Sequence, residues 1–196
     1  MIKTIDFYFD FVSPYSYLAH KRVRNVEKKN NLKFNYKPIL LGGLHNLIGI
    51  TAPAFINPKA KFMIRDCKMI AKKLNIQFRF NPLFPINSLN LMRGLLTIDP
   101  TNKSCYIDNF FDAYWQHALN LNEEKIIFDV LKKCKVKKIE FQKKIKELKI
   151  KNKLKKLTQE AFKKDVFGAP TFVVNNKIFW GQDRLDYALD EFFKKN

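Results

Sequence analysis

The chain has 196 residues, a length that fits one large domain or a small domain carrying an insertion. Its hydrophobic content of 46%, with 19 phenylalanines, excludes a globally disordered chain. The formal net charge of +19 raises the question of a nucleic-acid partner, and the absence of any run of about 18 apolar residues excludes a helical membrane span.

The first elements along the chain form a β-α-β pattern. Residues 3–12 alternate and then become continuously apolar, as in a strand covered on both faces. Ser13 is a candidate N-cap and Pro14 suits the first position of a helix, which the apolar spacing extends to about Asn31. Residues 32–40 alternate again, so we expect a second strand and a right-handed crossover.

The middle of the chain is predicted to be mainly helical. Residues 41–58 are rich in Gly and Pro, which indicates a loop or a lid. A helix is predicted over residues 59–74, because six apolar positions share one face: Phe62, Met63, Cys67, Ile70, Ala71 and Leu74. Residues 76–80 are expected to be extended, and Asn87 is predicted to cap a helix that runs through Leu95.

A lysine-rich stretch carries much of the positive charge. A buried helix is predicted over residues 102–119, and two or three amphipathic helices follow through Lys164. Residues 132–164 hold fifteen Lys and no Arg, although Arg is preferred for bidentate contacts to phosphates and bases. We therefore favour solvated helix faces over a specific nucleic-acid surface.

The last part of the chain reads as β-β-α. Strands are predicted at Thr171–Val174 and Ile178–Trp180, joined by a turn, and a helix follows with Leu185, Leu189, Phe192 and Phe193 on one side. With the β-α-β start, this is the element order of an α/β, thioredoxin-like fold with a large all-helical insertion. The expected domains are a discontinuous thioredoxin-like unit, residues 1–40 and 165–196, and a helical insertion, residues 41–164.

The cysteine count points to a reducing compartment. Cys67, Cys105 and Cys134 are an odd number, lie far apart in sequence and form neither a Cys-x-x-Cys motif nor a Cys/His metal spacing. They are interpreted as reduced, mostly buried residues, and no metal site is predicted. The chain opens without a basic and apolar leader pattern, so a cytoplasmic location is expected.

Three segments together resemble one family. Phe7–Ala19 reads FYFDFVSPYSYLA, Phe167–Phe172 reads FGAPTF, and Trp180–Leu185 reads WGQDRL. They resemble the 2-hydroxychromene-2-carboxylate isomerases and kappa-class glutathione transferases, within the wider DsbA family. Met63–Asp66 and Phe84–Ser88 are also similar to this family, so the resemblance covers nearly the whole chain.

The resemblance implies a homodimeric, glutathione-dependent enzyme that acts on a small molecule. Ser13 stands where thioredoxin-like oxidoreductases carry the first cysteine of Cys-x-x-Cys, so the reacting sulfur is expected to come from glutathione. Ser13 would be the catalytic residue, donating a hydrogen bond to the glutathione thiolate at a helix N-terminus. The expected cofactor-binding residues are Ser13, Ala169, Pro170 (if its peptide bond is cis), Trp180, Gly181, Gln182 and Asp183.

The substrate side departs from the family pattern. The family often carries a Lys shortly before a Gly-Asn pair in the region after the second strand, and here Asn46 and Ile50 stand at the Lys and Asn positions. His45, Asn57 and Asn87 are the candidate substrate-binding residues.

The sequence leads to one predicted function and two alternatives. The first is an isomerase of the 2-hydroxychromene-2-carboxylate type, in which the thiolate adds reversibly to an aromatic ketoacid. The second is a kappa-like transferase that conjugates an electrophile, and the third is a non-catalytic basic binding module. As structural alternatives, Ser13 and Asp183 would be simple helix caps and Trp180 a core residue.

Overall fold

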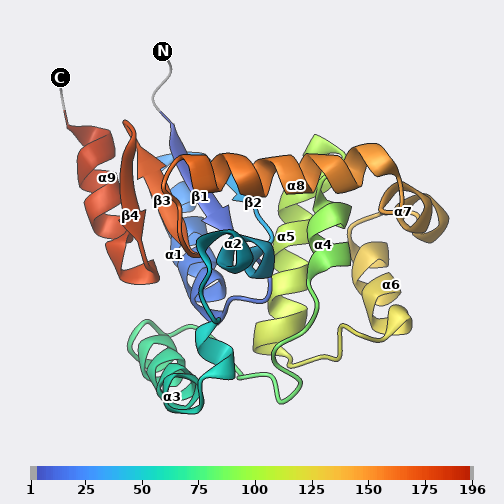
Figure 1. Ribbon diagram of the computed structural model, residues 1–196, viewed down its shortest axis with the longest axis horizontal. Coiled ribbons are helices and arrows are strands. Elements are labelled where there is room, and N and C mark those ends of the chain that lie inside the picture. The colour runs from blue at the N-terminus through green and yellow to red at the C-terminus, as the bar shows by residue number, and fades with distance from the viewer. Residues whose placement is uncertain (1–3, 195–196) are drawn as a thin grey trace.

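A computed structural model describes residues 4–194 and places a four-stranded sheet among helices (Figure 1). The strand order is β2-β1-β3-β4. The strands are β1 (Ile5–Phe9), β2 (Phe34–Pro38), β3 (Thr171–Val174) and β4 (Lys177–Trp180). β1 runs parallel to β2 and antiparallel to β3, and β3 runs antiparallel to β4. The predicted β-α-β and β-β-α ends are therefore confirmed, and they join in one sheet.

Helices from both ends of the chain accompany the sheet. α1 (Pro14–Asn30) begins at the predicted cap, Ser13, whose hydroxyl accepts a hydrogen bond from the backbone N–H of Ser16. α9 (Leu185–Phe193) follows a short 3-10 turn (Gln182–Arg184) and packs on β3 and β4. Residue 3 of the predicted first strand, and residues 1–3 and 195–196 of the predicted thioredoxin-like unit, lie outside the described residues.

The chain between β2 and β3 is helical. In Figure 1, α8 crosses over the sheet, while α4, α5, α6 and α7 gather at the end of the molecule away from α9. The helices are α2 (Leu41–Ile48), α3 (Asn57–Lys73), α4 (Leu89–Leu95), α5 (Lys103–Phe111), α6 (Glu124–Lys133), α7 (Lys138–Lys144) and α8 (Leu148–Lys163), with a π-helical segment (Asp112–Gln116) after α5 and 3-10 turns at Pro53–Phe55 and Pro100–Asn102.

The prediction of a loop or lid over residues 41–58 is wrong for residues 41–48, which form α2, and for residues 57 and 58, where α3 begins. The segment begins with α2, whose first backbone N–H, at Leu41, donates to the Asp10 carboxylate at 2.8 Å. The side chain of Leu44 is buried, and the helix ends at Gly49 in a left-handed conformation. The two glycines after Leu41 lower helix propensity, but these tertiary contacts outweigh that local preference.

The predicted apolar face of α3 is only partly confirmed. Met63, Cys67 and Ala71 are buried, whereas the Phe62 side chain is 54% exposed and Leu74 is also exposed. α3 lies at a corner of the molecule, so only a narrow stripe of the helix is covered (Figure 1). Residues 76–80 join no strand of the sheet, and Asn87 precedes α4 by two residues instead of capping it directly.

An aromatic core joins the sheet to the helices. Phe7, Phe9 and Phe11 are fully buried, and the Phe11 ring lies 4.9 Å from the ring of Phe111 on α5. The indole N–H of Trp115 donates to the backbone carbonyl of Phe11 at 2.8 Å. Complete burial of each such side chain contributes roughly 1.5–3 kcal/mol, so this core fixes the segment that leads from β1 to Ser13.

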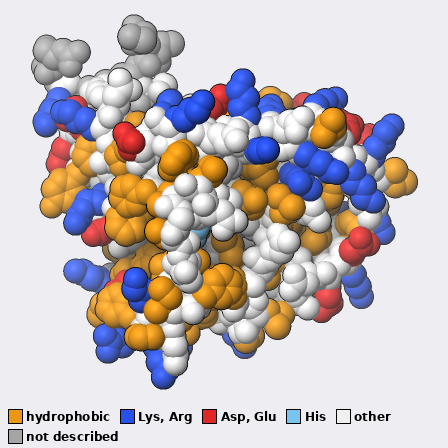
Figure 2. Space-filling view, in the orientation of Figure 1, with side chains coloured by type: hydrophobic (Ala, Val, Ile, Leu, Met, Phe, Trp, Pro, Cys, Tyr) orange, Lys and Arg blue, Asp and Glu red, His pale blue; other side chains and the backbone are white. Residues whose placement is uncertain are grey.

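The lysine-rich helices are amphipathic, as predicted. α8 buries Ile150, Leu154 and Ala161, while its lysines are exposed. Figure 2 shows Lys and Arg side chains along the edge of the molecule that α8 forms. Within residues 4–194, no helix has the length and apolar character needed to cross a membrane.

Candidate active site

Ser13 occupies the turn between β1 and α1 and is buried. Its hydroxyl donates to the backbone carbonyl of Ala169 at 3.0 Å and accepts from the backbone N–H of Ser16 at 3.1 Å. A serine hydroxyl has one hydrogen, which rotates toward the best acceptor. The Ser13 hydroxyl is therefore a rotatable hydrogen-bond donor at the N-terminus of α1, where the helix dipole favours an anion.

The loop before β3 belongs to the C-terminal part of the chain and lies next to Ser13. Its Ala169–Pro170 peptide bond is cis, which fulfils the condition attached to Pro170 in the sequence. Thr171 donates through its hydroxyl to the carbonyl of Gly168 at 2.7 Å, and the Gly181 N–H donates to the carbonyl of Pro170 at 2.9 Å. The loop is thus held on both sides, and the segments that carry Ser13, Pro170 and Gly181 are linked by hydrogen bonds.

The turn after β4 carries the other predicted cofactor-binding residues. Gly181 has φ 114 and ψ 153, a conformation that side chains disfavour. The Gln182 side chain is buried, and its Oε1 has no hydrogen-bond partner among residues 4–194. The exposed Asp183 carboxylate accepts from Arg184 at 2.9 Å.

Trp180 is a surface residue and not a core residue. Its side chain is 53% exposed, and its ring centroid lies 4.9 Å from that of Phe167. A Cβ atom added at Gly168 would lie 2.6 Å from the indole Nε1, so Gly168 makes room for this ring. Trp180 therefore forms an exposed apolar wall beside the loop of Pro170.

Arg22 is a member of this arrangement that the sequence did not indicate. It lies on α1 and donates through Nη1 to the backbone carbonyl of Gln182, and through Nη2 to both carboxylate oxygens of Asp186 at 2.9 Å. The helix that begins at Ser13 thus holds the turn of Gln182 in place. The contact joins residues 160 positions apart, and nothing in the local pattern around Arg22 signals it.

Asp10 is a second residue that sequence reasoning missed. Its carboxylate is completely buried and accepts from the N–H groups of Val12 at 3.1 Å and Leu41 at 2.8 Å, and it also bonds to the Ser88 side chain. Burial raises its pKa above the usual range, in spite of these hydrogen bonds. Asp10 fixes the turn before Ser13 to the start of α2 and to the segment before α4.

The three predicted substrate-binding residues differ in their surroundings. His45 on α2 is half-buried; burial lowers its pKa, and its Nδ1 lacks a hydrogen-bond partner within the described part of the chain. Asn87 is exposed, accepts from the Leu89 N–H at 3.1 Å, and adjoins Ser88, which contacts Asp10. Asn57 is the exposed first residue of α3.

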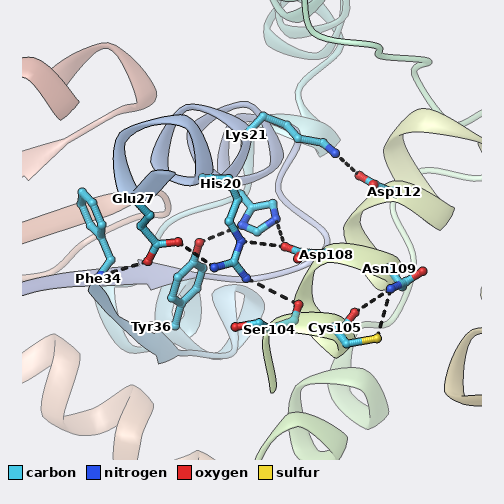
Figure 3. Close-up of polar contacts among 11 residues, drawn as sticks. His20, Lys21, Glu27, Phe34, Tyr36, Ser104, Cys105, Asp108, Asn109 and Asp112 are labelled. Atoms are coloured by element: carbon cyan, nitrogen blue, oxygen red, sulfur yellow. Dashed lines mark hydrogen bonds and ion pairs between the residues drawn. The ribbon is translucent and has the colours of Figure 1, made fainter. Parts of the chain in front are cut away.

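A buried polar cluster joins α1 to β2 and α5 (Figure 3). The fully buried His20 ring contacts the Tyr36 hydroxyl at 3.0 Å and the Asp108 carboxylate at 2.8 Å, and Arg24 donates to Asp108 at 2.8 Å. Burial lowers the pKa of His20 and exceeds the opposite effect of Asp108. Burial alone would raise the pKa of Asp108, but His20 and Arg24 outweigh it and lower that pKa. His20 therefore joins α1 to β2 and α5, which is a structural role.

Comparison with known proteins gives consistent matches. The family model described as a DSBA-like thioredoxin domain matches residues 4–193. A 2-hydroxychromene-2-carboxylate isomerase of Sphingobium xenophagum is 28% identical over 197 residues, which cover 95% of this chain and 96% of that protein. Glutathione S-transferase kappa 1 of Caenorhabditis elegans is 28% identical over 204 residues, covering 95% and 89%.

Solved structures show the same architecture. A 2-hydroxychromene-2-carboxylate isomerase structure superimposes with a TM-score of 0.88 at 25% identity, over 95% of this chain and 93% of that one. A probable DsbA oxidoreductase from Streptomyces coelicolor, at 11% identity, gives a TM-score of 0.72 over 99% and 92%. The predicted thioredoxin-like fold with helices inserted between its two parts is therefore confirmed.

Proposed function

Because the chain belongs to the family of DSBA-like thioredoxin domains, we propose that the Ser13 site binds glutathione and works as an isomerase of the 2-hydroxychromene-2-carboxylate type. The observation that carries the proposal is the Ser13 hydroxyl, placed at the N-terminus of α1 and 3.0 Å from the Ala169 carbonyl. The isomerase of Sphingobium xenophagum and the isomerase structure support the reaction type. The kappa transferases among the relatives support the cofactor.

The chemistry assigned to glutathione requires a stabilised thiolate. When bound, glutathione would supply a thiolate that adds reversibly to an aromatic ketoacid and leaves again, with no net redox change. Ser13 turns its hydroxyl hydrogen from the Ala169 carbonyl toward the thiolate, and charge-assisted hydrogen bonds of this kind are the stronger class. Together with the dipole of α1, this bond lowers a thiol pKa of ~8.5 toward neutrality.

The residues around Ser13 fit a peptide with charged ends. The backbone at Ala169, beside cis-Pro170, offers an edge along which an extended peptide can lie as an added strand. The unpartnered Oε1 of buried Gln182 is an acceptor for an ammonium group, and the Asp183 carboxylate lies next to it in the chain. Trp180 and Gly181 complete the proposed glutathione-binding surface. On the substrate side, the unpartnered Nδ1 of His45 is proposed to bind the substrate, together with Asn57 and Asn87.

Ser13→Ala is the test of this site. We expect glutathione to bind with similar affinity, but the pKa of its bound thiol to rise by about one unit, because one charge-assisted hydrogen bond is lost. At neutral pH the thiolate fraction then falls up to about tenfold. The measurement is a pH titration of thiolate ultraviolet absorbance in the glutathione complex.

Ser16→Ala is the matched control for that titration. Ser16 lies in the same helical turn, and its buried hydroxyl oxygen has no hydrogen-bond partner among the described residues. We expect its glutathione thiol to titrate as in the wild type. Failure of the wild type to bind glutathione would remove the enzyme proposal, and an unchanged thiol pKa in Ser13→Ala would reduce Ser13 to a helix cap.

Arg22→Met is expected to weaken glutathione binding without changing the pKa of the bound thiol. The substitution keeps most of the aliphatic packing but removes the hydrogen bonds to Gln182 and Asp186, so the turn of the binding site loses its support from α1. A cost of about 1 kcal/mol raises the dissociation constant roughly fivefold. Calorimetric titration measures it, with Arg65→Met on the exposed side of α3 as control. Equal affinities of Arg22→Met and wild type would contradict the positioning role.

A kappa-like transferase is the second candidate. The substitutions at Asn46 and Ile50 fall on the substrate side, while the contacts among Ser13, Pro170 and Gly181 involve the cofactor side. Turnover of 2-hydroxychromene-2-carboxylate without consumption of glutathione supports the isomerase. Stoichiometric consumption of glutathione with an aromatic electrophile, and no isomerisation, supports the transferase.

The setting of the enzyme is part of the proposal. We place it in the cytoplasm as a homodimer, built from a thioredoxin-like unit (residues 1–40 and 165–196) and a helical insertion (residues 41–164).

Figure 2 shows hydrophobic side chains gathered over α2, α3 and α9. Exposed members on these elements include Leu47, Phe62, Met69 and Tyr187. Such gathered apolar surface is typical of binding sites and subunit contacts, and the lysine-rich helix faces are assigned to solvent.

A further inference from the structure

Two cysteines that are far apart in the sequence meet in the helical part of the molecule. Cys105 lies in the first turn of α5, and Cys134 is the C-cap residue that follows α6. Their sulfur atoms are 2.7 Å apart. A disulfide bond needs a separation of about 2.05 Å, so the two sulfur atoms lie within about 1 Å of bonding distance.

The surroundings give the two thiols different roles. Cys105 is partly exposed, and its sulfur accepts a hydrogen bond from the Asn109 amide at 3.4 Å (Figure 3). Cys134 is buried, and burial raises the pKa of its thiol. The third cysteine, Cys67, is completely buried on α3, and burial raises the pKa of its thiol as well. A small oxidant in solvent therefore reaches Cys105 first, and Cys134 is the thiol within reach of it.

We propose that Cys105 and Cys134 form a reversible redox pair, which hydrogen peroxide or a related hydroperoxide converts to an intramolecular disulfide between α5 and α6. The proposal does not rest on the glutathione site, because neither cysteine belongs to it. The sequence predicted reduced cysteines that lie far apart along the chain; the fold brings this pair together.

The oxidation proceeds in two balanced steps. The Cys105 thiolate attacks one oxygen of hydrogen peroxide, so that an S–O bond forms, the O–O bond breaks, and the leaving hydroxide takes up a proton to become water. The Cys134 sulfur then attacks the Cys105 sulfur; the S–S bond forms, the S–O bond breaks, and the Cys134 proton leaves with the hydroxyl group as a second water. Two electrons pass from the two thiols to the peroxide, and two equivalents of a small thiol reverse the reaction.

The disulfide has a consequence for the helical part of the chain. It closes a loop of about thirty residues, a constraint that acts mainly on the unfolded chain. For a protein of this size, we expect the midpoint of thermal unfolding to rise by roughly 5 to 10 °C on oxidation. The bond is also one helical turn from Asp108, which contacts His20 and Arg24 of α1.

Thiol counting after mild oxidation tests the proposal. The full-length protein is treated with a few equivalents of hydrogen peroxide, denatured, alkylated and weighed by mass spectrometry. We expect the number of alkylated thiols to fall from three to one, with Cys67 the remaining thiol, and dithiothreitol to restore all three. Peptide mapping without reduction identifies the bridge, and calorimetry follows the thermal midpoint.

Single serine variants separate the pair from the third cysteine. Cys67→Ser is expected to form the same bridge and show the same thermal shift, whereas Cys134→Ser is expected to show neither. Three free thiols in the oxidised wild type would overturn the proposal. So would a bridge that includes Cys67 or joins two molecules, or oxidation of Cys105 to its sulfinic acid with Cys134 still free.

Discussion

Trp115→Ala is expected to lower the free energy of unfolding by about 4 kcal/mol, within the range observed for removal of a large buried aromatic side chain. Trp115 is fully buried in the π-helical segment after α5. Its ring lies 5.8 Å from that of Phe78, 5.5 Å from that of Phe80 and 5.6 Å from that of Phe84. The substitution leaves a cavity among these rings and removes the donor to the Phe11 carbonyl. Denaturation in urea, followed by circular dichroism, measures the change.

Trp115→Phe divides this effect into its two parts. Phenylalanine keeps an aromatic ring in the core but lacks the indole N–H, so the carbonyl of Phe11 loses its hydrogen bond. A cost of about 1–3 kcal/mol is expected for a buried polar group left without a partner. Since Phe11 lies two residues before Ser13, the same hydrogen bond also attaches the turn that carries Ser13 to the helical part of the molecule. Equal stabilities of wild type and Trp115→Ala would show that this core contact is absent in solution.

Gly94→Ala is expected to destabilise the protein by about 2 kcal/mol, although alanine is the better helix former. A Cβ atom at this position of α4 would lie 2.3 Å from the Phe141 ring and 2.4 Å from the Tyr106 hydroxyl. Both side chains are buried, and the Tyr106 hydroxyl is occupied in a 2.8 Å hydrogen bond to the Leu91 carbonyl. Neither can move without loss of packing, and overpacking of this kind costs typically about 1–3 kcal/mol.

Gly42→Ala is the matched control for the substitution at Gly94. Gly42 is also helical, but a Cβ atom there meets nothing within 4 Å. The gain in helix propensity is about 1 kcal/mol at most, so the change is expected to be neutral or stabilising. The midpoint of thermal unfolding should therefore fall in Gly94→Ala and stay the same or rise in Gly42→Ala. A shift to lower temperature of the same size in both would show that the crowding at Gly94 is not the cause.

The two ends of the chain were predictable because their signals are local. Serine is a preferred N-cap residue and proline suits the first helical position, so Ser13 and Pro14 predict the start of a helix. The structure places Ser13 at the N-cap of α1. The alternation in β1 and β2, and the short turn between β3 and β4, likewise specify strands through neighbouring residues. The hydrogen bond from the Ser13 hydroxyl to the Ala169 carbonyl joins the two ends of the chain. It forms because two segments that were each predicted from local signals lie next to each other in the fold.

The features that sequence reasoning missed depend on distant contacts. α2 forms where Gly and Pro suggested a loop, because the buried Asp10 carboxylate binds its first N–H group and Leu44 is covered. The exposure of Phe62 depends on how much of α3 the rest of the molecule covers. Arg22 contacts residues more than 150 positions away, and Cys105 meets Cys134 only because α5 packs on α6. No local pattern encodes these pairings.

The antiparallel pairing of β1 with β3 has a consequence for the order of events during synthesis. Tyr8 pairs with Thr171, so β3 leaves the ribosome roughly 10 to 30 seconds after β1 at ordinary rates of elongation. In that interval β1 can pair with β2, but its other edge stays open and is a point for wrong strand pairing. Ser13 is therefore synthesised well before Ala169, the residue whose carbonyl accepts its hydrogen bond. We expect pulse-proteolysis of stalled chains to show protection of β1 only after β3 has emerged.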